Sequence, residues 1–168
     1  MNSLITIGIA EMQVSQPPSA FVTYALGSCV GICLYDSVSK VGALGHILLP
    51  NFPAGNPNEK LHRYADTCIP DMVKAMERMG CLRSRITAKI AGGAKMFNVA
   101  DDSGFGNIGA RNVEAVKAAL QKLQVRIIAQ DTGLNYGRTV YFYTESGEMV
   151  VKSCTMGTKT YKRFAGYS

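Results

Sequence analysis

The sequence predicts a mixed α+β fold in one domain spanning residues 1–168. Two patterns of hydrophobic residues point to this fold. Short apolar, β-branched segments bounded by turn residues predict strands at residues 4–9, 21–25, 29–35, 41–49, 85–91, 126–129, 139–143 and 149–154. Apolar residues at helical spacing predict two helices, one starting near Asp66 or Thr67 and one from Asn107 to Leu123. A length of 168 residues, with 47% apolar and 18% charged residues, suits a single soluble domain.

Turn residues separate the predicted elements. Residues 16–19 read Gln-Pro-Pro-Ser and end the first strand region, and residues 51–58 concentrate Pro, Gly and Asn in a loop beside the strand 41–49. Gly92 and Gly93 lack the spacing and the Lys of a phosphate-binding loop, so we expect a tight turn or close backbone packing there. The last two strands form a predicted hairpin around Ser146 and Gly147.

The first predicted helix carries a stripe of apolar side chains and has clear limits. Pro70 must lie near its start, because a proline deep in a helix clashes with the preceding turn, and Gly80 supplies a stop. We expect the stripe to face the core rather than a cofactor or a partner groove, because methionine is a common core filler. The stripe consists of Ile69, Met72, Val73, Met76 and Met79.

Composition and charge restrict the class of protein. No apolar run is long enough to span a membrane and the N-terminus lacks the features of a secretory signal, so we expect a cytoplasmic protein without membrane insertion. The net charge of +6 suits an acidic partner. The basic residues are dispersed and no aromatic-interleaved basic motif occurs, which favours a solvated basic face or an acidic protein surface over nucleic acid.

The cysteines do not form a recognisable disulfide or zinc framework. They number five, an odd count, and no Cys-x-x-Cys pair occurs among Cys29, Cys33, Cys68, Cys81 and Cys154. We therefore expect no metal and no cofactor, and we expect the cysteines other than Cys29 to be reduced thiols that serve packing. A buried hydrophobic role is the ordinary one for a cysteine in an apolar strand, and it stays open for Cys29 on composition alone.

Cys29 and His46 are the strongest candidates for catalytic chemistry. If residues 25–27 form a three-residue hairpin loop with Gly27 at positive φ, Thr23 faces Cys29; if residues 36–39 close the next hairpin, Cys29 faces His46. A thiol, a base and a hydroxyl then lie in one row. Such a thiolate and imidazolium pair attacks carbonyl carbon, with Thr23 orienting the ring less strongly than a carboxylate does.

The segment 27–31 also matches the Gly-x-nucleophile-x-Gly pattern of a strand-to-helix elbow. That motif requires a helix directly after the nucleophile. Here apolar residues alternate through residue 35, which predicts a strand and disfavours the elbow.

Several blocks of the sequence together resemble the CheD chemotaxis family, in the family's order and over nearly the whole chain. They are Leu26–Asp36, Gly45–Pro50, Tyr64–Asp66, Ala88–Phe97, Asn107–Asn112 and Asp131–Gly133. The resemblance implies a sandwich-like β-sheet core flanked by helices, similar to the cytotoxic necrotizing factor deamidase toxins. It implies a chemoreceptor glutamine deamidase with Cys29 as nucleophile, His46 as base and Thr23 as third member. Leu134 departs from the family's usual second glycine, which puts the local turn or a substrate contact in question.

The resemblance also implies the reaction and the partners. Cys29 attacks the side-chain amide of a receptor glutamine, and backbone N–H groups near Ser28 and Cys29 hold the oxyanion, with Gly27 as a further candidate. The resulting thioester is hydrolysed to glutamate. The expected partners are the cytoplasmic domains of methyl-accepting chemoreceptors and a CheC-type phosphatase. Two alternatives remain, a regulatory binding module with little catalysis and a receptor glutamate methylesterase. A lowered pKa of Cys29 favours the enzyme, and an inert buried thiol favours the binding module.

Overall fold

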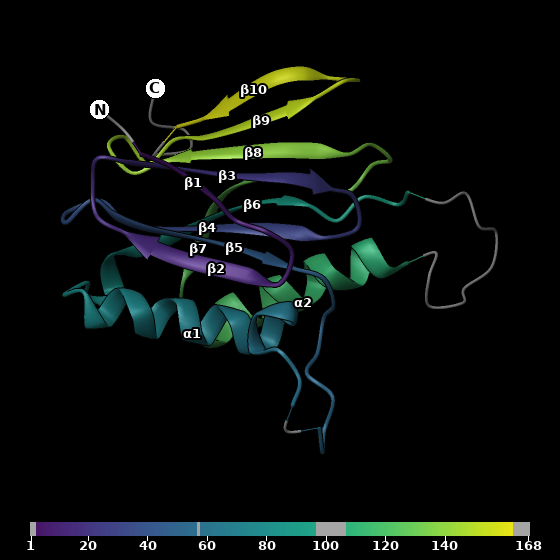
Figure 1. The fold of residues 1–168 in the computed structure, drawn as a ribbon, viewed down its shortest axis with the longest axis horizontal. Coiled ribbons are helices and arrows are strands. Elements are labelled where there is room, and N and C mark those ends of the chain that lie inside the picture. Colours follow the sequence, from purple (N-terminus) through teal and green to yellow (C-terminus); the bar gives the residue numbers. More distant parts are fainter. Residues whose placement is uncertain (1–2, 57, 97–106, 163–168) are drawn as a thin grey trace.

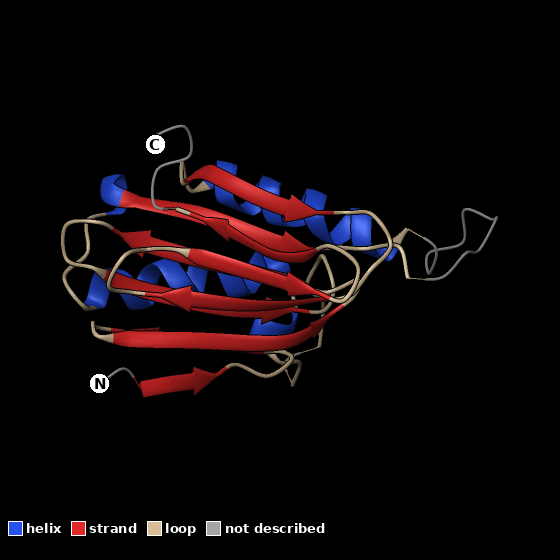
Figure 2. Cartoon of the chain, turned by 90° about the horizontal axis from the view of Figure 1, so that it is seen from above, coloured by secondary structure: helices blue, strands red, loops and turns tan. Residues whose placement is uncertain are grey.

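The computed structural model describes residues 3–56, 58–96 and 107–162, and it has three layers. Figure 1 shows a β-sheet stacked on a second β-sheet, whose other face is covered by the helices α1 (Ala65–Arg78) and α2 (Ile108–Lys122). Seen from above in Figure 2, both helices lie behind the strands. Neither α1 nor α2, nor any other helix in the described ranges, is long and apolar enough to cross a membrane.

Within the described residues, each sheet has five strands. The sheet farther from the helices, here called the outer sheet, has the order β1 (Ser3–Thr6), β3 (Ser19–Leu26), β8 (Arg138–Tyr143), β9 (Met149–Ser153) and β10 (Gly157–Tyr161). The sheet next to the helices, the central sheet, has the order β2 (Glu11–Ser15), β5 (Val41–Ile47), β4 (Val30–Asp36), β6 (Ile86–Gly92) and β7 (Arg126–Thr132). The pairs β1–β3 and β6–β7 are parallel, and the other neighbours are antiparallel. Two 3₁₀ turns, Leu61–Arg63 and Arg83–Arg85, complete the element set of the described residues.

The structure confirms the α+β class and the sandwich-like core, with both helices on one face. Two strands were not predicted, β2 and β10, and the predicted strand at residues 4–9 ends at Thr6. Both missed strands lie at sheet edges, and neither is fully buried on either face. An edge strand with polar residues lacks the apolar alternation from which strands are predicted, so its signal in the sequence is weak.

Side chains of the central sheet alternate between two buried layers. Val30, Ile32 and Leu34 of β4 face α1 and α2, and we call this the helix layer. Cys33 and Tyr35 of the same strand face the outer sheet, and we call this the inter-sheet layer. The central sheet is therefore buried on both faces, which accounts for the nearly continuous apolar character of β4 and β5.

The helices follow the predicted pattern closely. Helix α1 begins at Ala65, one residue before the expected range, and Gly80 adopts a φ of 93° just after its end. Met72 and Met76 are fully buried in the helix layer, so the core-facing prediction is confirmed. Asn107 occupies the N-cap position of α2, but its side chain makes no capping hydrogen bond. The predicted hairpin at Ser146 and Gly147 is confirmed by the antiparallel β8–β9 pair and by Gly147 N–H donating to Tyr143 O at 2.8 Å.

The predicted hairpin between residues 21–25 and 29–35 is wrong. β3 pairs with β1 and β8 in the outer sheet, whereas β4 pairs with β5 and β6 in the central sheet (Figure 1). The chain crosses from one sheet to the other at residues 27–29. The left-handed residue is Ala25, with a φ of 59°, and not Gly27. The same turn residues suit a hairpin or a crossing, and the long-range partner β8 decides between them.

Candidate active site

The three predicted catalytic residues converge on the inter-sheet layer, although not in the predicted row. His46 of β5 lies opposite Gly31 of β4 and not opposite Cys29. The pairing of β4 with β5 is therefore shifted by two residues from the predicted register. A shift of two residues leaves every side chain on its original face, so Cys29 and His46 still share the face toward the outer sheet. Cys29 lies just before β4 and is only 6% exposed, within the apolar cluster of the inter-sheet layer. It is a diagonal neighbour of His46, a relation in which Cα atoms are about 7 to 8 Å apart.

Thr23 reaches His46 from the opposite sheet. Its Oγ1 lies 2.7 Å from His46 Nδ1 and 2.7 Å from the carbonyl oxygen of Ile7. A carbonyl only accepts, so the single hydroxyl proton of Thr23 goes to Ile7, and Oγ1 accepts the proton that Nδ1 carries. This hydrogen-bond chain sets the tautomer of the ring: Nδ1 is protonated and Nε2 has a free lone pair.

His46 Nε2 is a buried atom without a hydrogen-bond partner in the described part of the chain. The side chain is fully buried, and this burial lowers the pKa of His46 from 6.5 to about 4. The ring is therefore neutral near pH 7. Its register partner in β2, Glu11, bonds instead to Gly8 N–H at 2.7 Å. The hydroxyl of Thr23 thus takes the position at the ring that a carboxylate occupies in other triads.

The thiol of Cys29 is also neutral at rest. Burial raises its pKa above the ordinary value, and a hydrogen bond from the backbone N–H of Cys29 to the sulfur opposes that rise. We therefore expect the thiolate–imidazolium pair to form only during the reaction and not in the unliganded protein. Desolvation penalises both charged forms, and the structure instead holds a thiol and a neutral imidazole in one dry layer.

The predicted oxyanion donors differ in availability. The N–H of Gly27 already donates to Ala25 O at 3.1 Å, so it is less available to an oxyanion. No backbone carbonyl among the described residues accepts the N–H of Ser28 or of Cys29 outside the regular ladders. These two N–H groups, at the turn that carries the thiol, are the better candidates for holding an oxyanion.

Gly92 and Gly93 pack against residues 27–29, here called the nucleophile turn, and Gly93 N–H donates to Cys29 O at 2.8 Å. Both have positive φ, and a Cβ on Gly92 would lie 2.2 Å from Cys29 O. The prediction of close backbone packing is thus confirmed, with the partner now identified. Asn112 of α2 also contacts this turn and was not predicted. Its signal was a polar residue at a core-facing position, four residues before the buried Val116.

The other four cysteines were predicted to serve packing. Cys33, Cys68 and Cys81 are buried as expected, but Cys154 is exposed, so the packing prediction for Cys154 is wrong. Across the described ranges, no group of three or more His, Cys, Asp and Glu side chains is arranged to hold a metal ion.

The turn after Gly133 forms although Leu134 replaces the second glycine that is usual in the family. Leu134 adopts a φ of 59° after Gly133 at 81°, and its carbonyl accepts the N–H of Lys95 at 2.8 Å. The side chain is 64% exposed. A left-handed conformation strains a leucine by about 1 to 2 kcal/mol, so the turn is retained at a modest energetic disadvantage.

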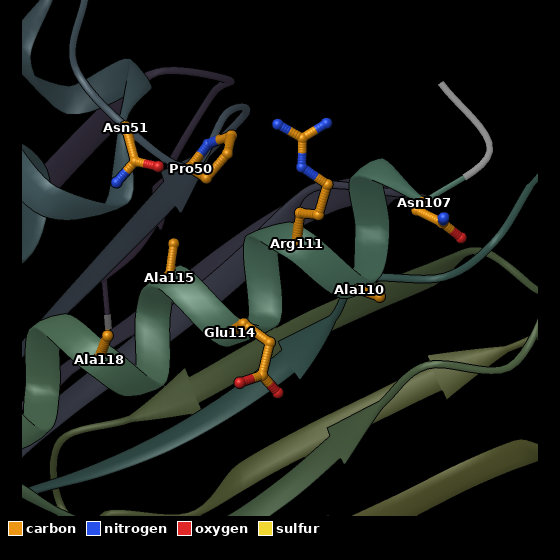
Figure 3. A pocket seen from close by; sticks show the side chains of 8 residues that line it. All are labelled: Pro50, Asn51, Asn107, Ala110, Arg111, Glu114, Ala115 and Ala118. Carbon is orange, nitrogen blue, oxygen red and sulfur yellow. The ribbon is translucent and has the colours of Figure 1, made fainter. Parts of the chain in front are cut away.

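A surface pocket of about 670 Å³ lies between α2 and the chain that follows β5. Figure 3 shows Ala110, Ala115 and Ala118 along the helix, with Arg111 extending on the side of Pro50. Neither Cys29 nor His46 lines this pocket. It therefore adjoins the segment after the His46 strand without being the reaction site.

The Cys29 thiol and an imidazole nitrogen without a hydrogen-bond partner among the described residues lie in one buried layer, beside two backbone N–H groups that no turn or loop carbonyl in the described ranges accepts. This is the arrangement expected of an enzyme with a cysteine nucleophile. Comparison with known proteins agrees with this class. The family profile described as "CheD chemotactic sensory transduction" matches residues 48–153. The chain belongs to the CheD family.

Curated relatives match far more of the chain. A protein of Lachnoclostridium phytofermentans is 46% identical over 91% of this chain and 95% of its own length. A protein of Clostridium novyi is 43% identical over 92% and 96%, and one of Syntrophomonas wolfei is 41% identical over 95% and 99%. Each carries the name "Probable chemoreceptor glutamine deamidase CheD". The first alignment leaves at most 15 residues of the chain unmatched, so it includes the strands that carry Thr23 and His46.

Proposed function

We propose that this protein is a chemoreceptor glutamine deamidase, which converts specific receptor glutamines to glutamates with release of ammonia. The names of relatives that match over nine-tenths of the chain support this activity. The structural observation that carries it is the Ile7–Thr23–His46 hydrogen-bond chain. This chain leaves Nε2 of His46 as a free base in the same buried layer as the Cys29 thiol.

The proposed reaction has two halves. In the first, Cys29 Sγ bonds to the side-chain amide carbon of the glutamine while the thiol proton moves to His46 Nε2. The imidazolium then gives that proton to the departing nitrogen, the C–N bond breaks, and ammonia leaves a glutamyl thioester on Cys29. In the second half, water gives a proton to Nε2 and attacks the thioester carbon. The C–S bond breaks, the thiol regains its proton and glutamate is released.

Neutral resting states suit this mechanism. Both charged forms are disfavoured by burial, so proton transfer accompanies the attack rather than preceding it. The negative charge then develops on the amide oxygen, where the N–H groups of Ser28 and Cys29 are proposed to donate. One such donor is worth roughly 3 kcal/mol. Acid–base catalysis by His46 contributes a rate factor of about 10² to 10⁴.

The proposed substrate is the cytoplasmic domain of a methyl-accepting chemoreceptor, and the proposed place of action is the cytoplasm. The net charge of +6 supports docking on an acidic helical surface. A CheC-type phosphatase is the second proposed partner. The raised pKa of Cys29 is the one observation that favours the alternative, a regulatory module that binds these partners with little catalysis.

Mass spectrometry of a receptor cytoplasmic domain, incubated with wild-type protein or with the Cys29→Ala variant, tests the proposal. Deamidation raises the mass of the modified peptide by about one dalton and releases one ammonia per event, and we expect both signals only with wild type. Methanol release from a methylated receptor would instead indicate the methylesterase. Binding to receptor or phosphatase without any mass change on several receptors would replace the deamidase with the regulatory module.

A further inference from the structure

Three consecutive carbonyl groups at the nucleophile turn are all held from one side. Gly27 O accepts the N–H of Ala94 at 2.8 Å, and Cys29 O accepts the N–H of Gly93 at 2.8 Å. Between them, Ser28 O accepts the side-chain amide of Asn112 at 2.9 Å. The carbonyls of the turn therefore point toward the end of β6 and the first turns of α2.

The orientation of these carbonyls sets the direction of the next N–H groups. In a trans peptide the C=O and the following N–H point in opposite directions. Anchoring Ser28 O to Asn112 thus turns the N–H of Cys29 away from α2. That N–H belongs to the residue that carries the thiol, and no backbone carbonyl among the described residues accepts it outside the regular ladders, so it can donate to the oxyanion that forms when Sγ attacks.

Asn112 holds a second carbonyl at the other side of the site. Its Nδ2 also donates to Leu48 O at 3.0 Å, and Leu48 lies two residues after His46. The side chain is fully buried. Both carbonyls face Nδ2 of Asn112. If the side-chain amide were rotated by 180°, Oδ1 would face the two carbonyl oxygens, and oxygen atoms of this kind cannot donate, so the nitrogen must occupy this position.

Close packing at the start of α2 brings the amide to this position. A Cβ on Gly109 would lie 2.4 Å from Ala94 O, so no larger residue allows the helix to come so near the turn after β6. Asn112 follows one helical turn later and reaches between the two chain segments. Of the three donors at the nucleophile turn, it is the one that belongs to a side chain.

We infer that Asn112 is a positioning residue, which orients the Ser28–Cys29 peptide as an oxyanion donor and ties the thiol turn to the segment carrying the base. It contacts neither the sulfur nor the imidazole. The inference rests on the proposed deamidase activity for its kinetic test, and on the reactivity of the thiol for an independent one.

Asn112→Ala removes the donor, and Asn112→Asp keeps the side-chain volume while placing carboxylate oxygens against the two carbonyls. For both we expect kcat for receptor deamidation to fall about 10- to 100-fold, with KM changed less than about twofold. We also expect Cys29 to react more slowly with iodoacetamide, measured on its own peptide by mass spectrometry, because the thiolate loses a hydrogen bond.

Val116→Ala is the matched control, since Val116 is fully buried one turn further along α2. It should lower the melting temperature by an amount similar to Asn112→Ala and leave kcat and the alkylation rate unchanged. Unchanged or faster alkylation in folded Asn112 variants would overturn the inference, as would an equal loss of kcat in Val116→Ala. Slower alkylation in a protein without detectable deamidation would support the positioning role while rejecting the proposed function.

Discussion

The two faces of the central sheet bury different chemistry. The buried side chains of the helix layer form an apolar cluster, which includes Val30 and Ile32 of β4 and the buried side chains of α1. The inter-sheet layer contains buried polar side chains among its apolar ones, including Thr23, His46 and Lys89. The central sheet thus packs against an apolar core on one face and contributes residues to the candidate active site on the other.

Buried polar groups of the inter-sheet layer are stabilised by partners from the opposite sheet. In the inter-sheet layer, the outer sheet supplies partners for groups on the central sheet: Thr23 bonds His46, and Lys89 Nζ donates to Gly147 O at 2.7 Å. A buried polar atom without a partner destabilises a protein by about 1 to 3 kcal/mol. His46 Nε2 is such an atom, and we interpret its retention as the requirement of catalysis for a free base.

Two cysteines on the same face give the largest expected contrast. Cys29→Ala should reduce deamidation by at least about 10⁴-fold, because no other group can form the thioester. Cys33→Ala removes a thiol from the same layer, in the strand that Cys29 precedes, and should leave kcat within about threefold while lowering stability by about 1 kcal/mol. Initial rates of ammonia release measure the activity of both variants, and melting curves measure their stability. Equal losses of activity would mean that the layer, and not Cys29, is required.

Truncation of a buried side chain in the helix layer should lower stability without lowering activity. Met76 is fully buried there, so Met76→Ala should lower the free energy of unfolding by about 2 to 5 kcal/mol. At a temperature where the variant is folded, kcat should match wild type. Urea unfolding followed by circular dichroism measures the first quantity, and a loss of kcat beyond about threefold would show that the two faces are coupled.

Thr23→Val should have an intermediate effect on catalysis. It removes the acceptor for Nδ1–H and the donor to Ile7 O, so the ring loses its fixed tautomer and kcat should fall about 10- to 100-fold without vanishing. Thr144→Val is the control, since Thr144 is a buried threonine with its own bonds to Ser19. It should lose comparable stability and keep its activity. Complete inactivation of folded Thr23→Val would contradict the ranking of Thr23 below Cys29.

The smallest expected effect concerns the turn after β7. Leu134→Gly should raise the free energy of unfolding by about 0.5 to 1 kcal/mol, because glycine accepts positive φ and the exposed leucine buries little. Leu82→Gly, at an exposed leucine with a φ of −92°, should instead lower it by a similar amount. Thermal melts of the two variants give opposite shifts if backbone strain is the cause.

Alternation and turn composition allowed much of this fold to be predicted. The face shared by Cys29 and His46 survived a wrong register because the error was an even number of residues. The pairing of Thr23 across two sheets was not predictable, since residues 27–29 suit a hairpin as well as a crossing. The choice depends on β8, more than 100 residues later in the chain.

The resting charges of the site escaped prediction for a related reason. The sequence shows which residues carry a thiol and an imidazole, but their pKa values depend on burial by segments distant in sequence. His46 has a lower pKa in the folded state than in the unfolded chain, so folding excludes its proton. Stability is therefore full above the unfolded pKa of about 6.5 and decreases as the pH falls toward about 4, by about 2 kcal/mol at pH 5.

A ¹⁵N NMR titration of the His46 ring tests directly whether this ring is held as a free base. We expect a protonated Nδ1 and an unprotonated Nε2 at neutral pH, and a midpoint near 4. Thr23→Val should mix the tautomers. A ring protonated at Nε2, or a midpoint at the ordinary value of 6.5, would contradict the claim that Thr23 and the inter-sheet layer hold His46 as a free base.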